Sequence, residues 1–520
     1  MSSPTERNRY PFRSAVVKDA AVKTVWVLGD QLNRGIASLS DATPVDTRVL
    51  FVTSRRLLAS KRWHRQRLHV VLASMAKLAR SLRMEGFEVD ELLAPTLADG
   101  LAAHRAEFAP TEVVAMSPRS WNAVTMLEHH GVRVVANDQF LCSAETFAGW
   151  AATRKSRLRM EDFYRWQRQR LDILIEGDGE PSGGRWNFDA DNREPPPRDG
   201  RPWPEPELFA LDNIDELICA QIDELCPQAF GQHSNGLWPT TTAEAEQRLN
   251  RVIAEVLPLF GPHEDAMLHG EWHLAHTLLS SALNIGLLDP HVVVDRAEAA
   301  YRSGAVPMAS AEGLIRQIIG WREYVWGLYW LWMPEYATRN GLRAHRPIPP
   351  AFVGGTTQMR CVDRCVADMD ERGYAHHIQR LMVLGNLALL SGIDPQAMTE
   401  WMWAGFVDAA EWVMVPNVVG MSLHADGGQM ATKPYAAGGA YISKMSDYCK
   451  GCAYDPKQRT GDKACPFTTL YWDFLARHEE QFRSNHRMSN AMAGLRRLSD
   501  LPAVRDRAAD VLAALDAGTL

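Results

Sequence analysis

Three cysteines near the carboxyl end of the sequence have the spacing of metal ligands. Cys449 and Cys452 are separated by two residues, and Cys465 follows after a short loop and precedes a proline. Two thiolates at this spacing can bind one metal centre, and Cys361 or Cys365, four residues apart on one helical face, could supply the fourth ligand. The spacing alone fits zinc and an iron–sulfur cluster equally well, and the Cys-Pro pair favours the cluster.

Two adjacent histidines, His376 and His377, lie at the start of a predicted helix whose inward face is otherwise apolar. Neighbouring side chains on a helix project about 100° apart, so at most one of the two rings can face the core. A histidine near its ordinary pKa can act as a general acid at neutral pH. Such a pair taken alone is more often structural than catalytic.

Two other segments place polar groups among apolar residues. Thr277 and Ser280, near a predicted helix start, offer hydroxyls and free backbone N–H groups that suit a phosphate. Gln317 and Arg322 lie on a helix that is rich in tryptophan. Each of these signals is weak by itself.

The elements that must hold these residues fall into two patterns. From 24 to 145, short β-branched runs alternate with amphipathic helices, which predicts a Rossmann-like parallel sheet covered by helices. Ligands of such sheets lie beyond the carboxyl ends of strands, here at Gly29, Asp30 and Gln31, although Asp30 could equally cap a turn. No GxGxxG motif is present, so the dinucleotide fingerprint is absent.

The remaining chain predicts an all-helical domain from 208 to 520, because its apolar spacing is helical and strand patterns are nearly absent. Before it, 146–207 includes a Gly- and Pro-rich stretch and is predicted to be an interdomain linker, and 1–23 is predicted to be a polar amino-terminal extension. The fold class is therefore α/β plus all-α. The predicted helices of the second domain span 242–257, 311–332, 358–371, 374–391, 396–413 and 465–482.

Composition restricts the possible partners only loosely. The net charge of −7 means that a DNA contact would need a local basic patch. The stretch 154–171 interleaves arginines with aromatic residues and could touch phosphates, although an ordinary solvated helix face is the favoured interpretation. The 17 tryptophans suit a helical core, stacking or electron transfer.

We expect a cytoplasmic protein with no membrane partner. No apolar run reaches membrane-spanning length, and the polar amino-terminal residues contain no secretory signal. In a reducing compartment the cysteines are thiols or metal ligands rather than disulfides.

Taken together, these motifs resemble one family, the bacterial photolyases and cryptochrome-like proteins that contain an iron–sulfur cluster, which include prokaryotic (6-4) photolyases. The resemblance covers nearly the whole chain. It is carried by the segments LGDQLN, GGRWNFDADNREPPP, GLIRQIIGWREYVWGLYW, GYAHHIQRLMVLGNLALLSGIDP, ADGGQMATKPYAAGGAYISKMSDYCKGCAYDPK and TGDKACPFTTLYWDFLARH.

The resemblance implies an antenna-type α/β domain, a helical domain that binds bent FAD, and a monomeric protein that acts on UV-damaged DNA. Light would excite reduced FAD, and an electron would pass to a damaged base pair flipped out of the duplex and then return. The residues around the lesion would be His376, His377 and Tyr435. The FAD site would draw on His276, Thr277, Ser280, Gln317, Arg322, Asp408 and Asn417. A four-iron four-sulfur cluster would be bound by Cys361, Cys449, Cys452 and Cys465, with Cys365 as a bystander.

The sequence departs from this family along the route by which electrons reach oxidised flavin. Val353 stands where a tryptophan is usual, and Met402 replaces an aromatic residue. Trp401 remains on this route, and Trp403 could substitute as a carrier. Met414 replaces an acidic residue close to the flavin.

The antenna pocket departs from the family as well. Thr53 stands where a glutamate would bond a ribityl-lumazine chromophore, and the loss of that carboxylate removes a specific contact. Occupancy by ribityl-lumazine therefore stays open, with an empty pocket or another pigment as alternatives.

Three functions are compatible with this sequence. A light-driven (6-4) photolyase is favoured because the lesion-site residues are all present. A cryptochrome-type blue-light receptor without repair activity is the alternative, supported by the changes at 353, 402 and 414. A helical DNA-binding protein stapled by zinc and lacking flavin is the third.

Overall fold

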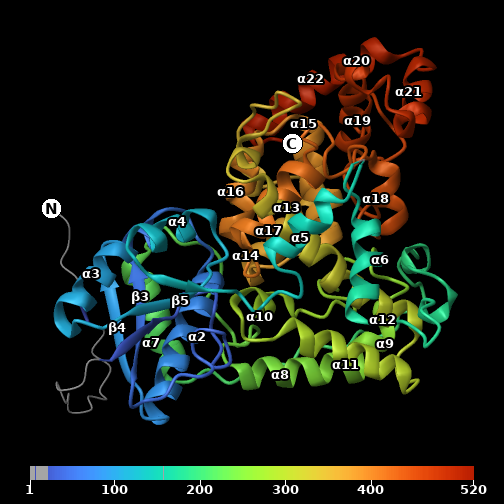
Figure 1. Cartoon of the computed structure of the whole chain (residues 1–520). Coiled ribbons are helices and arrows are strands. Elements are labelled where there is room, and N and C mark those ends of the chain that lie inside the picture. The colour runs from blue at the N-terminus through green and yellow to red at the C-terminus, as the bar shows by residue number, and fades with distance from the viewer. Residues whose placement is uncertain (1–5, 8–21, 156) are drawn as a thin grey trace.

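The computed structural model describes residues 6–7, 22–155 and 157–520, and it has two parts (Figure 1). A sheet covered by helices is formed by the amino-terminal part of the chain, and a larger all-helical body is formed by the rest. The predicted fold class of α/β plus all-α is confirmed. The expected polar extension, 1–23, lies mostly outside the described residues.

The sheet has the strand order β1-β4-β3-β2-β5-β6. Five strands run parallel, and the short β1, within the expected extension, pairs antiparallel with β4. Buried β-branched and aliphatic residues line the central strands, as expected for a sheet covered on both faces. The strands are β1 (Glu6–Arg7), β2 (Lys23–Trp26), β3 (Thr47–Ser54), β4 (Glu88–Ala94), β5 (Val113–Met116) and β6 (Arg133–Val135).

Helices of the first part follow the predicted alternation with strands. The long helix expected from Trp63 to Met84 is α2, and its amino terminus is capped by His64, whose ring accepts from the Gln66 N–H. The helices here are α1 (Arg55–Ala59), α2 (Arg65–Met84), α3 (Leu97–Phe108) and α4 (Trp121–His129).

The segments between the two parts differ from their expected roles. In the expected linker, 146–207, α5 (Ala144–Ala152) and α6 (Met160–Leu171) pack against α13 of the helical part. Conversely, α7 (Asn213–Leu225), within the expected second domain, packs on α2 beside the sheet (Figure 1). An apolar stripe shows that a helix is buried on one side, but it does not show which partner covers it.

The helical part is built from amphipathic helices with conventional starts. Thr241 and Glu244 form a capping box at α8, and Asp394 caps α16 just before a proline at its first position. The elements, of which η3, η4, η7 and η8 are π-helical and η5, η6 and η9 are 3₁₀-helical, are α8 (Thr242–Arg251), η3 (Val252–Val256), α9 (Leu257–Phe260), α10 (Ser280–Ile285), α11 (Pro290–Arg302), α12 (Met308–Ile315), η4 (Arg316–Arg322), α13 (Glu323–Trp332), η5 (Glu335–Thr338), η6 (Pro350–Phe352), α14 (Arg360–Arg372), η7 (Gln379–Gly385), α15 (Asn386–Ser391), α16 (Pro395–Gly405), α17 (Glu411–Val415), η8 (Pro416–Ser422), α18 (Gly439–Met445), α19 (Pro466–Arg477), α20 (Glu479–Phe482), η9 (His486–Met488), α21 (Ser489–Arg496) and α22 (Leu501–Ala517). The 3₁₀ turns η1 (Ser182–Gly184) and η2 (Asp189–Asn192) precede them.

Several predicted helices are interrupted. The helix expected at 374–391 begins at His377, and the helix expected at 396–413 is broken between α16 and α17. Within the described residues, no helix is both long and apolar enough to cross a bilayer.

The loop after β2 holds the two parts together. Gln31 donates to Met116 O at 2.9 Å inside the sheet domain, and the backbone N–H of Leu32 donates to Ile285 O at the end of α10. Arg119 donates to Asn284 O at 2.6 Å in the same region. The strand end that was expected to be a ligand site or a turn cap therefore fixes the position of α10, which carries Ser280.

Candidate functional site

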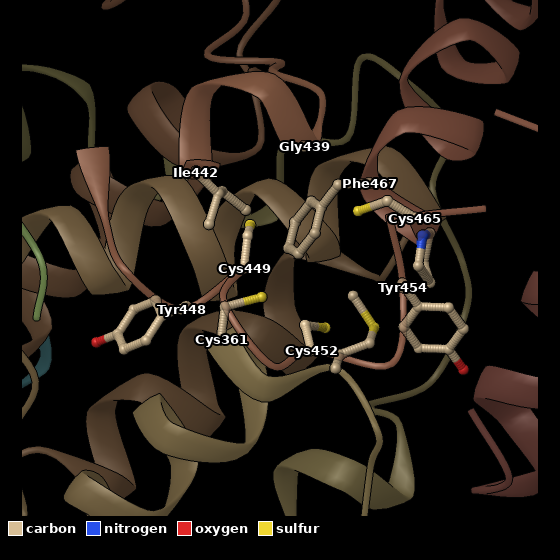
Figure 2. Close-up of a pocket in the computed structure, with 11 residues that line it drawn as sticks. Cys361, Gly439, Ile442, Tyr448, Cys449, Cys452, Tyr454, Cys465 and Phe467 are labelled. Atoms are coloured by element: carbon tan, nitrogen blue, oxygen red, sulfur yellow. The ribbon is translucent and has the colours of Figure 1, made fainter. Parts of the chain in front are cut away.

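Four cysteines gather from three segments of the helical part (Figure 2). Cys361 lies on α14, Cys449 and Cys452 lie in one loop, and Cys465 is the residue just before α19. All four line one pocket and none is in a disulfide. The buried Cys365, one helical turn beyond Cys361, does not line it, as expected for a bystander.

The four thiols are spread more widely than one tetrahedral ion requires. Zn–S bonds of about 2.3 Å would place tetrahedral sulfur ligands about 3.8 Å apart. Among the described residues, no three of these cysteine sulfurs lie within 4.8 Å of one another. In this structure the four thiols are thus not arranged as the tetrahedral ligands of one ion.

The protonation of the buried thiols depends on their surroundings. Burial and then the neighbouring Cys465 raise the pKa of Cys361, and the same causes raise the pKa of Cys449 to about 11. A bound metal would favour the thiolate form of both groups. Gly439 leaves room beside them, because a Cβ at that position would lie 2.9 Å from Cys465 Sγ.

The histidine pair belongs to a second site that contains three imidazoles. The rings of His276 and His376 stack with centroids 4.5 Å apart, and His377 packs edge-on against His276 at 5.5 Å. The expectation that only one ring of the pair faces the core agrees with the structure: His376 is buried and His377 is exposed. Gly373, in the left-handed conformation, ends α14 and directs the chain into this segment.

Burial sets the protonation of the inner two rings. It lowers the pKa of His276 and of His376 well below the ordinary value, and neighbouring histidines add to the effect. Both ring nitrogens of His376 and Nε2 of His276 are buried without a hydrogen-bond partner among the described residues. These neutral rings are thus available to a bound molecule, whereas His377 Nε2 lies 3.6 Å from Asp265 Oδ1.

A buried acid, Glu264, lies behind the histidines. Gln317 Nε2 donates to Glu264 Oε1 at 2.5 Å, which joins the predicted Gln317 to this site. Burial raises the pKa of Glu264 to about 7, while His377 and Arg316 oppose the shift. No motif in the sequence marks this residue, because its burial depends on the packing of distant segments.

Ser280 and Asp408 are brought together from distant parts of the chain. Asp408 accepts from Ser280 Oγ at 2.8 Å and from Arg380 Nη1 at 2.8 Å. Arg380 also donates to Ala375 O and lies over the Phe406 ring, so it links this group to the histidine segment. The sequence offered no signal for Arg380 beyond its place three residues after His377. Within the part of the chain that the structure describes, no hydrogen bond of the Thr277 side chain is observed.

Arg322 and Asn417 do not join this group. Arg322 pairs with Glu323 at 2.7 Å, donates to Gln139 O and covers the ring of Phe140. The amide of Asn417 donates to Val413 O, within its own helical segment.

Tyr435 is linked to His377 indirectly, through Arg193 and Asp265. Its half-buried ring has a pKa raised by burial, an effect that Arg193 opposes. Arg193 Nε in turn lies 3.9 Å from Asp265 Oδ2, the carboxylate beside His377. The structure therefore groups His276, His376 and His377, and Tyr435 is connected to them through the charges of Arg193 and Asp265.

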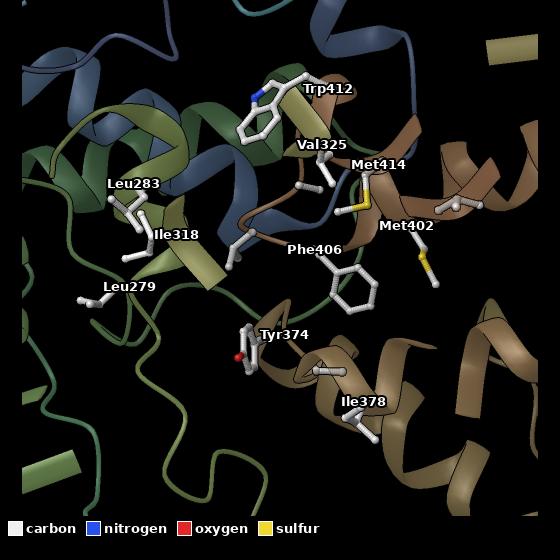
Figure 3. Close-up of a cluster of buried hydrophobic side chains, with 14 of the residues drawn as sticks. Leu279, Leu283, Ile318, Val325, Tyr374, Ile378, Met402, Phe406, Trp412 and Met414 are labelled. Carbon is white, nitrogen blue, oxygen red and sulfur yellow. The ribbon is translucent and has the colours of Figure 1, made fainter. Parts of the chain in front are cut away.

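The two predicted electron carriers point in different directions. Trp401 stacks on Phe352 at 4.8 Å and donates to its carbonyl oxygen, next to the exposed Val353. Trp403 instead packs on Trp63 of the sheet domain. Figure 3 shows Met402 and Met414 on the two segments that flank Phe406, and both side chains are buried.

The sheet domain contains a pocket that Thr53 lines. Thr53 lines it together with Glu91, which comes from the adjacent strand β4. Glu91 is buried, burial raises its pKa, and it pairs with Arg83 at 2.5 Å. Thr53 supplies no carboxylate to this pocket, but the adjacent Glu91 does. No motif in the sequence marks Glu91.

Comparisons with known proteins place this architecture in one class. The fold is that of photolyases and cryptochromes: a bacterial class III photolyase from Agrobacterium tumefaciens has a TM-score of 0.56 at 16% identity, with 98% of this chain and 100% of that chain covered. The cryptochrome of Synechocystis sp. PCC6803 has a TM-score of 0.54 at 16% identity, with 79% and 83% covered.

Sequence relatives give the family. Residues 25–238 match the family described as deoxyribodipyrimidine photo-lyase-related protein. A protein named (6-4) photolyase from Agrobacterium fabrum (strain C58) is 40% identical over 491 residues, which covers 92% of this chain and 96% of that protein. The chain belongs to the photolyase-related family, and the resemblance drawn from its sequence to the photolyase and cryptochrome class is confirmed.

Proposed function

We propose that this protein is a DNA photolyase that uses light to revert (6-4) pyrimidine photoproducts in DNA. The observation that carries the proposal is the group of His276, His376 and His377, in which the two inner rings have free buried nitrogens, in a chain similar over 92% of its length to a (6-4) photolyase. We assign Tyr435, whose charged neighbour Arg193 lies beside Asp265, to the same lesion site.

The residues around α10 fit FAD. The hydroxyl of Ser281 and Nε2 of His276 are buried without hydrogen-bond partners among the described residues, so they can receive polar groups of a cofactor. Ser280 lies next to them, and its hydroxyl is fixed by the hydrogen bond that it donates to Asp408. When bound and reduced, FAD supplies the excited electron that starts repair.

The protein's own side chains handle the proton. His377, 46% exposed, is the ring that can exchange a proton with a base flipped out of the duplex. The buried, neutral His376 stacks on His276 and is held ready to hydrogen-bond the lesion. Arg193, exposed beside Asp265, would contact a flanking phosphate.

We also assign a four-iron four-sulfur cluster to Cys361, Cys449, Cys452 and Cys465. The four thiols that line one pocket, three of them at the spacing of the Cys-Lys-Gly-Cys unit followed by Cys465, support this assignment. Cys452→Ser is expected to lose iron and to become insoluble or partly unfolded, as measured by iron content and circular dichroism. Cys365→Ser is the matched control and should retain iron. A Cys452→Ser protein that is iron-free yet folded and soluble would exclude a structural role for the cluster.

Repair by the reduced, purified protein tests the main proposal. Oligonucleotides with one (6-4) photoproduct or one cyclobutane dimer are illuminated with blue light, with a dark control for each. We expect light-dependent restoration of the (6-4) oligonucleotide only, and His377→Asn should slow it by about 100-fold or more.

A blue-light receptor of cryptochrome type is the second candidate. The replacement of the expected aromatic residues by the exposed Val353 and the buried Met402, with Trp403 packed on the sheet domain, favours it. Flavin binding without repair of either lesion would reject the photolyase proposal and support the receptor.

A further inference from the structure

The segment just before the first cysteine of the Cys-Lys-Gly-Cys unit touches the chain that leads to His276. Met267 N–H donates to Met445 O at 2.9 Å, and His269 N–H donates to Asp447 Oδ1 at 2.8 Å. One backbone–backbone hydrogen bond and one backbone–carboxylate hydrogen bond therefore join the segment before the cysteine loop to the chain that leads to His276.

The same segment reaches the second histidine segment through two buried side chains. The backbone N–H of His376 donates to Gln379 Oε1 at 3.0 Å, and Gln379 Nε2 donates to Tyr448 Oη at 2.9 Å. Both Gln379 and Tyr448 are 1% exposed. Water therefore cannot replace either bond, and loss of one partner leaves a buried polar group unpaired.

Tyr448 belongs to the cysteine site as well. It directly precedes Cys449, and its ring lines the pocket that the thiols share. In Figure 2 its hydroxyl points away from the sulfur atoms. The ring of Tyr448 thus contacts the cysteine site, and its hydroxyl accepts the hydrogen bond from Gln379, which leads to His376.

We propose that Gln379 and Tyr448 are positioning residues: when the cysteine site holds its metal centre, Tyr448 is fixed, and Tyr448 and Gln379 in turn fix the backbone of His376. The inference rests on the proposed function, because it assigns the centre a part in holding the lesion site. His376 lies just before the helix that begins at His377, so no helical hydrogen bond of its own fixes its backbone N–H. Gln379 replaces that restraint, and Tyr448 orients Gln379.

Hydrogen exchange of the His376 amide tests the proposal without reference to activity. In the iron-loaded Tyr448→Phe variant, the amides of the peptide spanning 373–379 should exchange about five-fold faster than in the parent protein. The exchange rate of a peptide from β3 should be unchanged. Tyr454→Phe is the matched control, since Tyr454 lines the same pocket but makes no hydrogen bond to Gln379. It should leave exchange at 373–379 unaltered.

Iron depletion distinguishes positioning from simple packing. Chelation should speed exchange at 373–379 in the parent protein and add little in Tyr448→Phe, because the link has already been cut. Equal, additive effects of chelation in both proteins would overturn the proposal, as would an unchanged exchange rate in Tyr448→Phe.

A second pair of variants keeps the test valid if Tyr448→Phe does not fold. Gln379→Glu keeps an acceptor for both the His376 N–H and the Tyr448 hydroxyl and should preserve slow exchange, whereas Gln379→Leu should not. Repair of the (6-4) oligonucleotide is measured in parallel and should fall about three- to ten-fold in Tyr448→Phe. A parent protein that repairs nothing but shows the exchange coupling would contradict the photolyase proposal alone.

Discussion

At the scale of single residues, the carboxyl group of Glu264 makes the stability of the protein depend on pH. Burial raises its pKa from 4.5 to about 7 in the folded protein. Between these values the folded state keeps a proton that the unfolded state has released, so the free energy of unfolding falls as pH rises and levels off above pH 7. Glu264→Gln removes this loss, which amounts to at most about 3 kcal/mol.

Thermal unfolding measured between pH 5 and pH 8 checks this prediction. Glu264→Gln should lose less stability over that range than the parent protein, while the exposed Glu335→Gln should follow the parent. Glu323 also has a pKa raised by burial to about 7, so some pH dependence will persist in the variant. Parallel pH curves for Glu264→Gln and the parent would contradict the assigned burial.

The sequence predicted those site residues that a short motif marks, and it missed those whose role depends on distant segments. The thiols of the Cys-Lys-Gly-Cys unit and the opposite faces of His376 and His377 follow from spacing alone. Glu264, Gln379 and Tyr448 have no such signal, since their burial arises where segments remote in sequence meet. Membership in a family supplied Tyr435, which no periodic pattern distinguishes from other tyrosines.

At the scale of elements, the helical period predicted helices but not their interruptions. Residues 311–332 have the apolar spacing of one helix, whereas the structure contains the π-helical turn η4 between α12 and α13. The predicted site residues Gln317 and Arg322 both lie in that turn, and Asn417 lies in η8. Such turns shift the helix face by part of a residue, which a count of apolar positions does not detect, and they recur at functional sites.

The packing of α5 against α13 gives a test at this scale. Gly327 on α13 faces Phe147 on α5, and a Cβ at position 327 would overlap the Phe147 ring. Because both helices are buried at this contact, Gly327→Ala should destabilise the protein by about 1–3 kcal/mol through overpacking. The midpoint of thermal unfolding and the retention of flavin measure the effect.

Gly149 supplies the matched control within the same pair of helices. It lies in α5, and a Cβ added there would meet no other atom within 4 Å, so Gly149→Ala should be neutral or stabilising by up to about 1 kcal/mol. Equal midpoints for the Gly327 and Gly149 variants would show that α5 and α13 are not in close contact.

At the scale of the whole molecule, the two parts share elements rather than meeting at one linker. Helices α5 and α6 join the helical part, α7 returns to the sheet, and the loop after β2 contacts α10. The spacing of apolar residues predicted the fold of each part correctly, because this periodicity is a local property of the sequence. The placement of α5, α6 and α7 depends on which apolar helix faces pack against one another, and no single segment of the sequence determines that pairing.

Arg119 is the buried charge that connects the parts, and its removal should loosen them. It donates to Asn284 O and to Gln139, and its charge opposes the rise that burial causes in the pKa of the partly buried Asp30. Arg119→Met should destabilise the protein by about 1–3 kcal/mol, because the buried acceptors lose their donor and Asp30 loses a nearby positive charge. Arg133→Met, which removes the exposed ion pair with Glu112, should cost less than about 1 kcal/mol.

Hydrogen exchange locates the consequence of this change within the molecule. In Arg119→Met, peptides covering 280–286 should exchange faster than in the parent, since the carbonyl contacts that fix α10 are lost, and flavin retention should fall with them. The double variant Arg119→Met with Asp30→Asn should recover part of the stability, because no uncompensated charge remains. Full stability of the single variant would contradict a connecting role for Arg119. If the double variant recovers stability but not exchange protection at 280–286, the two effects of Arg119 are separate. Its charge would then act on Asp30, and its hydrogen bonds alone would hold α10.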